Sequence, residues 1–140
     1  MTWEELPGRF ALLGFAEHAT PADLAAIQDG AAPGQLTREG GETTLLLAAD
    51  GLDAALARHP GAACERGLVW IRFRASMEWT VVGFLARVCT RLAEAGVPVG
   101  AVCGYSRDSL FVAEAHLAAT RAALVELYPE HASAAEGSTP

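Results

Sequence analysis

The segment of residues 75–83 joins an apolar stretch to the most regular helical pattern in the chain. The first N–H groups of a helix lack partners within the helix and carry a partial positive charge, so they can hold a carboxylate without a basic side chain. Gly83 has no side chain to obstruct a ligand that approaches the backbone. This segment is therefore a candidate anion-binding turn. The alternative is that Ser76 or Thr80 simply caps the helix.

Asp108 lies in a predicted hairpin turn near the end of the chain, and Tyr105 and Arg107, which precede it, have the same two possible roles as Asp108: to contact a ligand or only to support the turn. The Asp108 carboxylate could receive a ligand ammonium, although aspartates in turns commonly bond to their own backbone instead. Helix N–H groups for a carboxylate, with Asp108 or Glu78 for an amine, would together recognise both ends of a zwitterion.

The common catalytic motifs do not occur in the sequence, including GxSxG, HExxH, GxGxxG and the Walker motif. Cys103 is the one candidate nucleophile, but a cysteine on an apolar strand is usually a core residue. The chain has no lysine, which excludes Schiff-base and P-loop lysine chemistry. We expect a protein that is not an enzyme and needs no cofactor.

The three cysteines form no CxxC pair, so neither a disulfide framework nor a zinc site is indicated, and buried, reduced thiols are expected. The histidines are scattered without the spacing of metal ligands, which predicts surface positions and no bound metal. The residues in question are Cys64, Cys89, Cys103, His18, His59, His116 and His131.

The composition fits a folded protein of 140 residues, because 51% are hydrophobic and 19% are charged. A net charge of −7 argues against nucleic acid and anionic membrane as partners. No uncharged apolar run approaches the roughly 20 residues that span a bilayer, and Glu4 and Glu5 stand where a secretion signal would carry positive charge. We expect a cytoplasmic protein. The absence of lysine and asparagine, with abundant alanine, is typical of a GC-rich bacterial genome.

Periodicity predicts strands over 9–16, 35–38 and 42–49, with helices over 21–28 and 52–58, the first capped by Thr20. The second half predicts strands over 68–75, 97–105 and 109–112, with helices over 80–95 and 114–128. Val81, Leu85, Val88 and Leu92 form the apolar stripe of the longest helix. The order βαββα thus occurs twice, and a shift of 65 residues places the second copy on the first.

The second half also resembles the ACT domain, a ligand-binding module of ferredoxin-like fold, in residues 73–75, 78–86, 92–99 and 105–112. The closest likeness within that family is to small bacterial proteins with tandem ACT domains. The first half looks like a diverged companion repeat, most clearly over residues 42–47. Two departures from the family pattern stand out. The turn before the helix lacks the Asp-Arg-Pro-Gly sequence common in ACT domains. The Thr-Asp-Tyr sequence usual in the tandem-ACT subfamily is replaced by Arg107-Asp108-Ser109.

This resemblance implies an α/β fold of the α+β sandwich type: two ferredoxin-like βαββα repeats with antiparallel sheets and helices on one face. It implies a diverged repeat over 1–66, an ACT domain over 67–129 and a disordered tail over 130–140. Such domains typically bind amino acids between modules, at the turn before the first helix. The implied ligand-binding residues are Ser76, Met77, Glu78, Thr80, Gly83, Cys103, Gly104 and Asp108.

The resulting hypothesis is a regulatory protein that senses an amino acid and acts as a homodimer. The alternative is an interaction module that pairs through sheet edges and has lost ligand binding.

Overall fold

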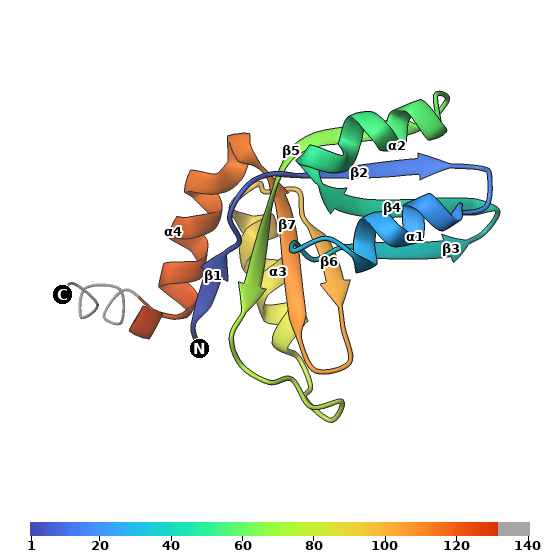
Figure 1. Ribbon diagram of the computed structural model, residues 1–140. Helices are drawn as coiled ribbons and strands as arrows, with labels where there is room; N and C mark the ends of the chain where they lie inside the picture. The colour runs from blue at the N-terminus through green and yellow to red at the C-terminus, as the bar shows by residue number, and fades with distance from the viewer. Residues whose placement is uncertain (132–140) are drawn as a thin grey trace. The chain divides into compact units, whose positions relative to one another are not determined.

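The computed structural model describes residues 1–131, which form an α+β protein of antiparallel strands and four α-helices (Figure 1). The strands are β1 (Trp3–Glu5), β2 (Phe10–Phe15), β3 (Gln35–Glu39), β4 (Glu42–Ala48), β5 (Ala63–Phe73), β6 (Gly100–Cys103) and β7 (Asp108–Ala113). The α-helices are α1 (Pro21–Gln28), α2 (Leu52–Arg58), α3 (Phe84–Glu94) and α4 (Leu117–Leu127). Short 3-10 helices, η1 (Ala49–Gly51) and η2 (Glu114–His116), precede α2 and α4. None of the described helices is long and apolar enough to cross a membrane.

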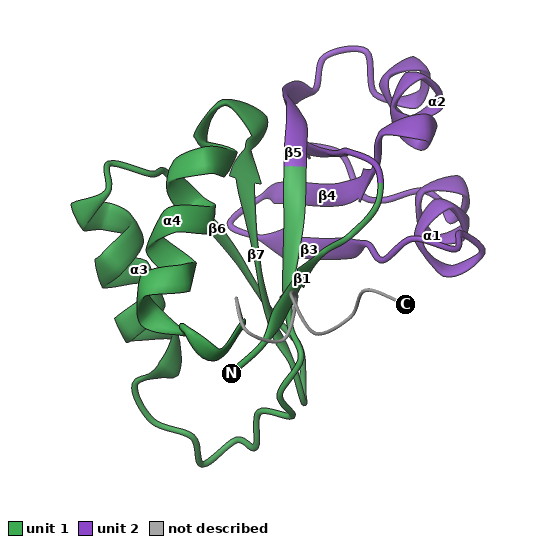
Figure 2. Ribbon diagram, turned by 90° about the vertical axis from the view of Figure 1, so that its left-hand side faces the viewer, with its two compact units in different colours: residues 1–7, 69–140 green, residues 8–68 purple. Residues whose placement is uncertain are grey.

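The chain divides into two compact units, shown in green and purple in Figure 2. Unit 1 comprises Met1–Pro7 and Val69–Pro140, and unit 2 comprises Gly8–Leu68. The first residues belong to unit 1 because β1, a strand that the sequence patterns did not predict, pairs antiparallel with Ile71–Phe73 of β5. The ranges of the compact units therefore differ from the expected 1–66 and 67–129 chiefly at the N-terminus.

Unit 2 has its strands in the order β3-β4-β2-β5, all antiparallel. Helices α1 and α2 begin and end at the predicted residues. Thr20 is the N-cap of α1, and its side chain and that of Asp23 form a capping box, which satisfies the N–H groups that a helix start leaves free. The buried cluster of this unit includes Leu13, Leu45 and Ala55, each fully buried.

Unit 1 pairs β1 and β7 with the second part of β5, and β6 with β7. Its buried cluster joins alternate residues of β5 and β7 to the apolar stripe of α3, where Val88 and Leu92 are fully buried. Phe84, the first residue of α3, packs edge-on against Phe73 with the ring centroids 4.9 Å apart. The start of α3 is thereby held against the sheet.

Helix α3 begins at Phe84 and not at the expected Thr80, because Gly83 takes a φ of 82° and becomes the N-cap. This left-handed conformation ends the preceding turn and favours glycine. The idea that Ser76 or Thr80 caps the helix is therefore wrong. Val81, expected in the buried stripe, precedes the helix and is 49% exposed.

The predicted tail begins within the described part of the chain. Glu130 pairs with the N-terminal amine, and the ring of His131 stacks on Trp3 with centroids 4.1 Å apart. Residues 132–140 lie outside the described residues.

Candidate functional site

A cavity of about 380 Å³ lies in unit 1 between the turn that precedes α3 and the β6–β7 hairpin. Six of the eight predicted ligand-binding residues line it: Met77, Glu78, Gly83, Cys103, Gly104 and Asp108. The other two predicted residues, Ser76 and Thr80, are exposed and are not among the residues that line it. The structure thus brings most of the predicted set together around one space.

A main-chain hydrogen bond joins the turn to the hairpin, and a second one closes the hairpin itself. The Met77 N–H donates to the Ser106 carbonyl at 2.8 Å, and the Met77 side chain is buried. The Gly104 N–H donates to the Arg107 carbonyl at 2.8 Å, which closes the hairpin immediately after Cys103 and Asp108, the last pair of the β6–β7 ladder. The turn and the hairpin are therefore held at a fixed separation without any side chain bridging them at that contact.

The N-terminus of α3 meets this space without a side-chain cap from the described residues. A Cβ atom added at Gly83 would meet no other atom within 4 Å, so the backbone there is open. The first N–H groups of an 11-residue helix are consequently available to an anion such as a ligand carboxylate.

The charged side chains among the lining residues are both acidic, those of Glu78 and Asp108. A carboxylate in a partly desolvated cavity favours a cationic group, so these two residues complement the amine of a ligand. The same cavity therefore offers helix N–H groups to an anion and carboxylates to a cation.

The thiol of Cys103 is exposed, which corrects the expectation of buried cysteines; Cys64 and Cys89 are half-buried. Desolvation raises the pKa of the Cys103 thiol, and the nearby carboxylate of Asp108 raises it further. Because the thiolate is the reactive form, this environment works against a nucleophilic role for Cys103.

Aromatic and aliphatic side chains at the cavity rim complete the site, and of these the sequence analysis considered only Tyr105, beside Asp108, as a ligand contact. Trp79 is 91% exposed and Tyr105 is 94% exposed, and both line the cavity with Val81. Single exposed apolar residues are common on protein surfaces, but several around one cavity mark a place where another molecule binds. For Trp79, the signal in the sequence was its place between the predicted strand 68–75 and the predicted helix 80–95.

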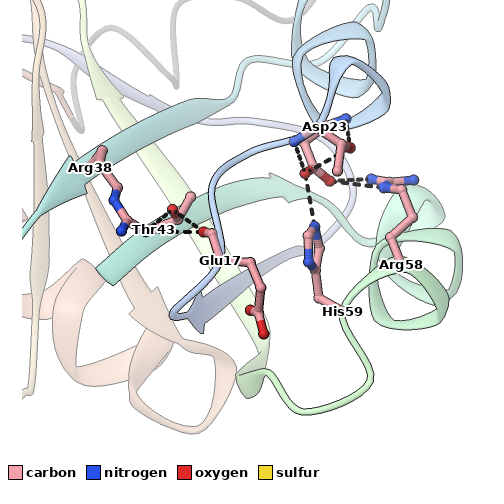
Figure 3. A network of polar contacts seen from close by, with 7 residues as sticks. Glu17, Asp23, Arg38, Thr43, Arg58 and His59 are labelled. Carbon is pink, nitrogen blue, oxygen red and sulfur yellow. Dashed lines mark hydrogen bonds and ion pairs between the residues drawn. The ribbon is translucent and has the colours of Figure 1, made fainter. Parts of the chain in front are cut away.

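A polar network in unit 2 centres on Asp23, which is fully buried (Figure 3). Its carboxylate accepts hydrogen bonds from the Thr20 N–H and from the Nε atom of Arg58, both at 2.8 Å, and lies 2.8 Å from the Nε2 atom of His59. Burial favours the neutral acid, but these hydrogen bonds outweigh it and lower the pKa of Asp23 to about 2. His59 is buried and stacks on Phe15, so the prediction that it lies on the surface was wrong.

A second network of unit 2 joins its hairpin to the turn before α1 (Figure 3). The Nη1 atom of Arg38 donates to the carbonyls of Ala16 and Glu17, at 2.6 Å and 3.0 Å, and to the hydroxyl of Thr43 at 2.8 Å. That hydroxyl donates to the Glu17 carbonyl at 2.6 Å. These residues carry no recognisable motif, and the sequence analysis did not single them out.

No family model matches the sequence, and no curated protein matches it. Solved structures do. Protein Atu0741 of Agobacterium tumefaciens superposes with a TM-score of 0.71 and 22% identity, over 89% of this chain and 87% of that one. The regulatory subunit of aspartate kinase from Thermus thermophilus superposes with a TM-score of 0.63 and 12% identity, over 88% and 95% of the two chains.

A chain from the structure of the aspartokinase alpha and beta subunits gives a TM-score of 0.68 at 14% identity, over 92% of this chain and 98% of that chain. The fold is ACT-like. At these identities the likeness concerns the fold alone.

Proposed function

We propose that this protein is a non-enzymatic regulatory protein that binds an amino acid in the cavity of unit 1. The observation that carries the proposal is the open, uncapped N-terminus of α3 facing the same 380 Å³ space as two carboxylates. The helix N–H groups would receive the carboxylate of the amino acid, and Asp108 or Glu78 would receive its ammonium group. Trp79 and Tyr105 would cover the side chain of the ligand.

We also propose that the chain consists of two ACT-like βαββα repeats, over 1–66 and 67–129. The 65-residue shift found in the sequence supports this, because it places η1 on η2 and the first residue of α2, Leu52, on that of α4, Leu117. The residues before these 3-10 helices also match: Ala48 has φ and ψ of −63° and 145°, and Ala113 has −66° and 143°.

A regulatory role is supported by the aspartate kinase regulatory subunits among the structures of similar fold. We propose that the protein works in the cytoplasm of a bacterium as a homodimer, with neither nucleic acid nor membrane as its partner. The net charge of −7 is the observation that supports the last two points.

The second candidate is an interaction module that pairs through a sheet edge. It is supported by β6, which lies at one end of the strand order and carries no charged residue. Ala101 and Cys103 on this strand are exposed. Edge strands without charges or proline can pair with another chain.

A thermal-shift screen of the twenty amino acids, followed by calorimetric titration, tests the first candidate. A ligand at 100 times its dissociation constant should stabilise the protein by about 2.7 kcal/mol. Asp108→Ala should then weaken binding by about tenfold to a hundredfold, the value of a hydrogen bond to a charged group. Val82→Ala is the matched control, because Val82 is 94% exposed and is not among the lining residues.

Absence of stabilisation by every amino acid would contradict the binding function and favour the sheet-edge candidate. Equal affinity of the wild type, Asp108→Ala and Glu78→Ala would place the ligand elsewhere.

A further inference from the structure

We infer that unit 2 has no counterpart of the ligand position of unit 1, because Arg38 and Thr43 bridge its hairpin to the turn before α1. This inference rests on the proposed function of the unit 1 cavity. The two positions compared are the spaces between the hairpin of each unit and the turn before the first helix of that unit.

The two hairpins give the equivalence of the positions directly. Cys103 pairs with Asp108 at the turn end of the β6–β7 ladder, and both residues line the cavity. A shift of 65 residues leads to Arg38 and Thr43, which pair with each other in the β3–β4 ladder. Each pair thus stands in the same register of its own hairpin, close to the turn.

The side chains of these two pairs differ in whether they contact the turn before the helix. In unit 2, Arg38 and Thr43 reach the carbonyls of Ala16 and Glu17, in the turn that leads to α1, with hydrogen bonds of 2.6–3.0 Å (Figure 3). Thr43 is fully buried. In unit 1, Asp108 is half-buried and Cys103 is exposed, and both face open space. The exposed guanidinium of Arg38 therefore bridges, in unit 2, the two segments whose counterparts border a cavity in unit 1.

The helix start of unit 2 is also satisfied from within. The hydroxyl of Thr20 accepts a hydrogen bond from the Asp23 N–H, and the Asp23 carboxylate accepts one from the Thr20 N–H. In unit 2 the helix N-terminus is thus capped, and the counterpart of Asp108 is the uncharged Thr43. The position in unit 2 that corresponds to the cavity of unit 1 is therefore closed.

The test exchanges the pairs in the full chain. In Cys103→Arg/Asp108→Thr, the residues of unit 2 stand in unit 1 and should close the cavity, so that the affinity for the amino acid found in the screen falls by about a hundredfold or more. Cys103→Arg alone, which keeps the carboxylate of Asp108, is the milder form if the double variant does not fold. Arg38→Ala is the counterpart in unit 2 and should leave the affinity unchanged. Calorimetry of the wild type should give a stoichiometry of one.

Hydrogen exchange provides a readout that needs no ligand. The amides of Thr20 and Asp23, which donate to the side chains of the capping box, should exchange more slowly than those of Phe84 and Leu85 at the uncapped start of α3. A stoichiometry of two would overturn the inference and leave the proposed function intact, and so would loss of binding in Arg38→Ala alone. If no amino acid binds the wild type, the proposed function fails. Rapid exchange at Thr20 and Asp23 of the wild type would then overturn the closure of unit 2 as well.

Discussion

The turns that lead into α1 and α3 have the same place in their units, but side chains of the described residues hydrogen-bond the N–H groups at the start of α1 and not those at the start of α3. Before α1, Thr20 and Asp23 cap the helix, and Arg38 covers the carbonyls of the turn. Before α3, a glycine in the left-handed region starts the helix without a side-chain cap. The comparison teaches that a helix N-terminus becomes a binding site only where the chain leaves its N–H groups without partners of its own.

The largest effect on stability is expected at Asp23, whose buried carboxylate binds Arg58 and His59 in unit 2. Asp23→Asn removes the charge that pairs with Arg58 and His59 while both remain in place, so the free energy of unfolding at pH 7 should fall by about 3 kcal/mol. Urea denaturation measures this loss, with the exposed Asp29 as control in Asp29→Asn.

The same variant makes a pH prediction. The pKa of Asp23 is about 2 in the folded protein against 3.8 ordinarily, so its ionisation stabilises the fold above pH 3.8, and this contribution is lost as the pH falls toward 2. The difference in stability between wild type and Asp23→Asn should therefore be constant near neutral pH and shrink below about pH 4. A difference that stays constant down to pH 2 would show that the carboxylate charge is not what stabilises this unit.

A smaller effect on stability is expected in the β6–β7 ladder, at the pair that lies farthest from the hairpin turn. Gly100 pairs with Phe111 in unit 1, and the 65-residue shift places them on Gln35 and Leu46, which pair in unit 2. A Cβ atom at Gly100 would lie 1.9 Å from the Phe111 ring, so Gly100→Ala should lower the free energy of unfolding by about 1–3 kcal/mol. Thermal denaturation measures this change.

Phe111→Leu, which copies the smaller partner found in unit 2, should recover much of that loss in the double variant. If the two substitutions are simply additive, the ring is not the source of the cost, and the two ladders are less alike than their registers indicate.

The smallest effect concerns the thiols. Cys103 is exposed at the cavity, whereas Cys64 in unit 2 is half-buried. A thiol reagent should modify Cys103 first, although slowly near neutral pH because its pKa is raised. Bound amino acid should slow the reaction of Cys103 and leave that of Cys64 unchanged, as mass spectrometry of the labelled peptides would show. Protection of Cys64 instead would place the ligand in unit 2.

The sequence predicted elements well where the signal is local. Thr20, Pro21 and Asp23 form a start signal within four residues, and α1 begins there. The start of α3 was misplaced because the apolar residues before Gly83 continue the helical spacing, and only the backbone conformation of Gly83 ends the turn. β1 was missed because it gains its partner from residues some 70 positions away, which no local pattern records.

The same distinction applies to the candidate site. Glu78, Gly83 and Asp108 were predicted because helix starts and hairpin turns have recognisable sequences. The closing contacts of Arg38 and the pairing of Asp23 with His59 depend on segments 21 to 36 positions apart. Such contacts follow from the fold and not from a motif.

Chemical-shift mapping by NMR tests the central claim most directly. Titration of the labelled full-length protein with the amino acid that emerges from the screen should shift the amides of residues 77–86 and 103–108, which border the cavity, and leave those of residues 16–24 in place. Shifts concentrated at residues 16–24, or at none of these segments, would contradict the account.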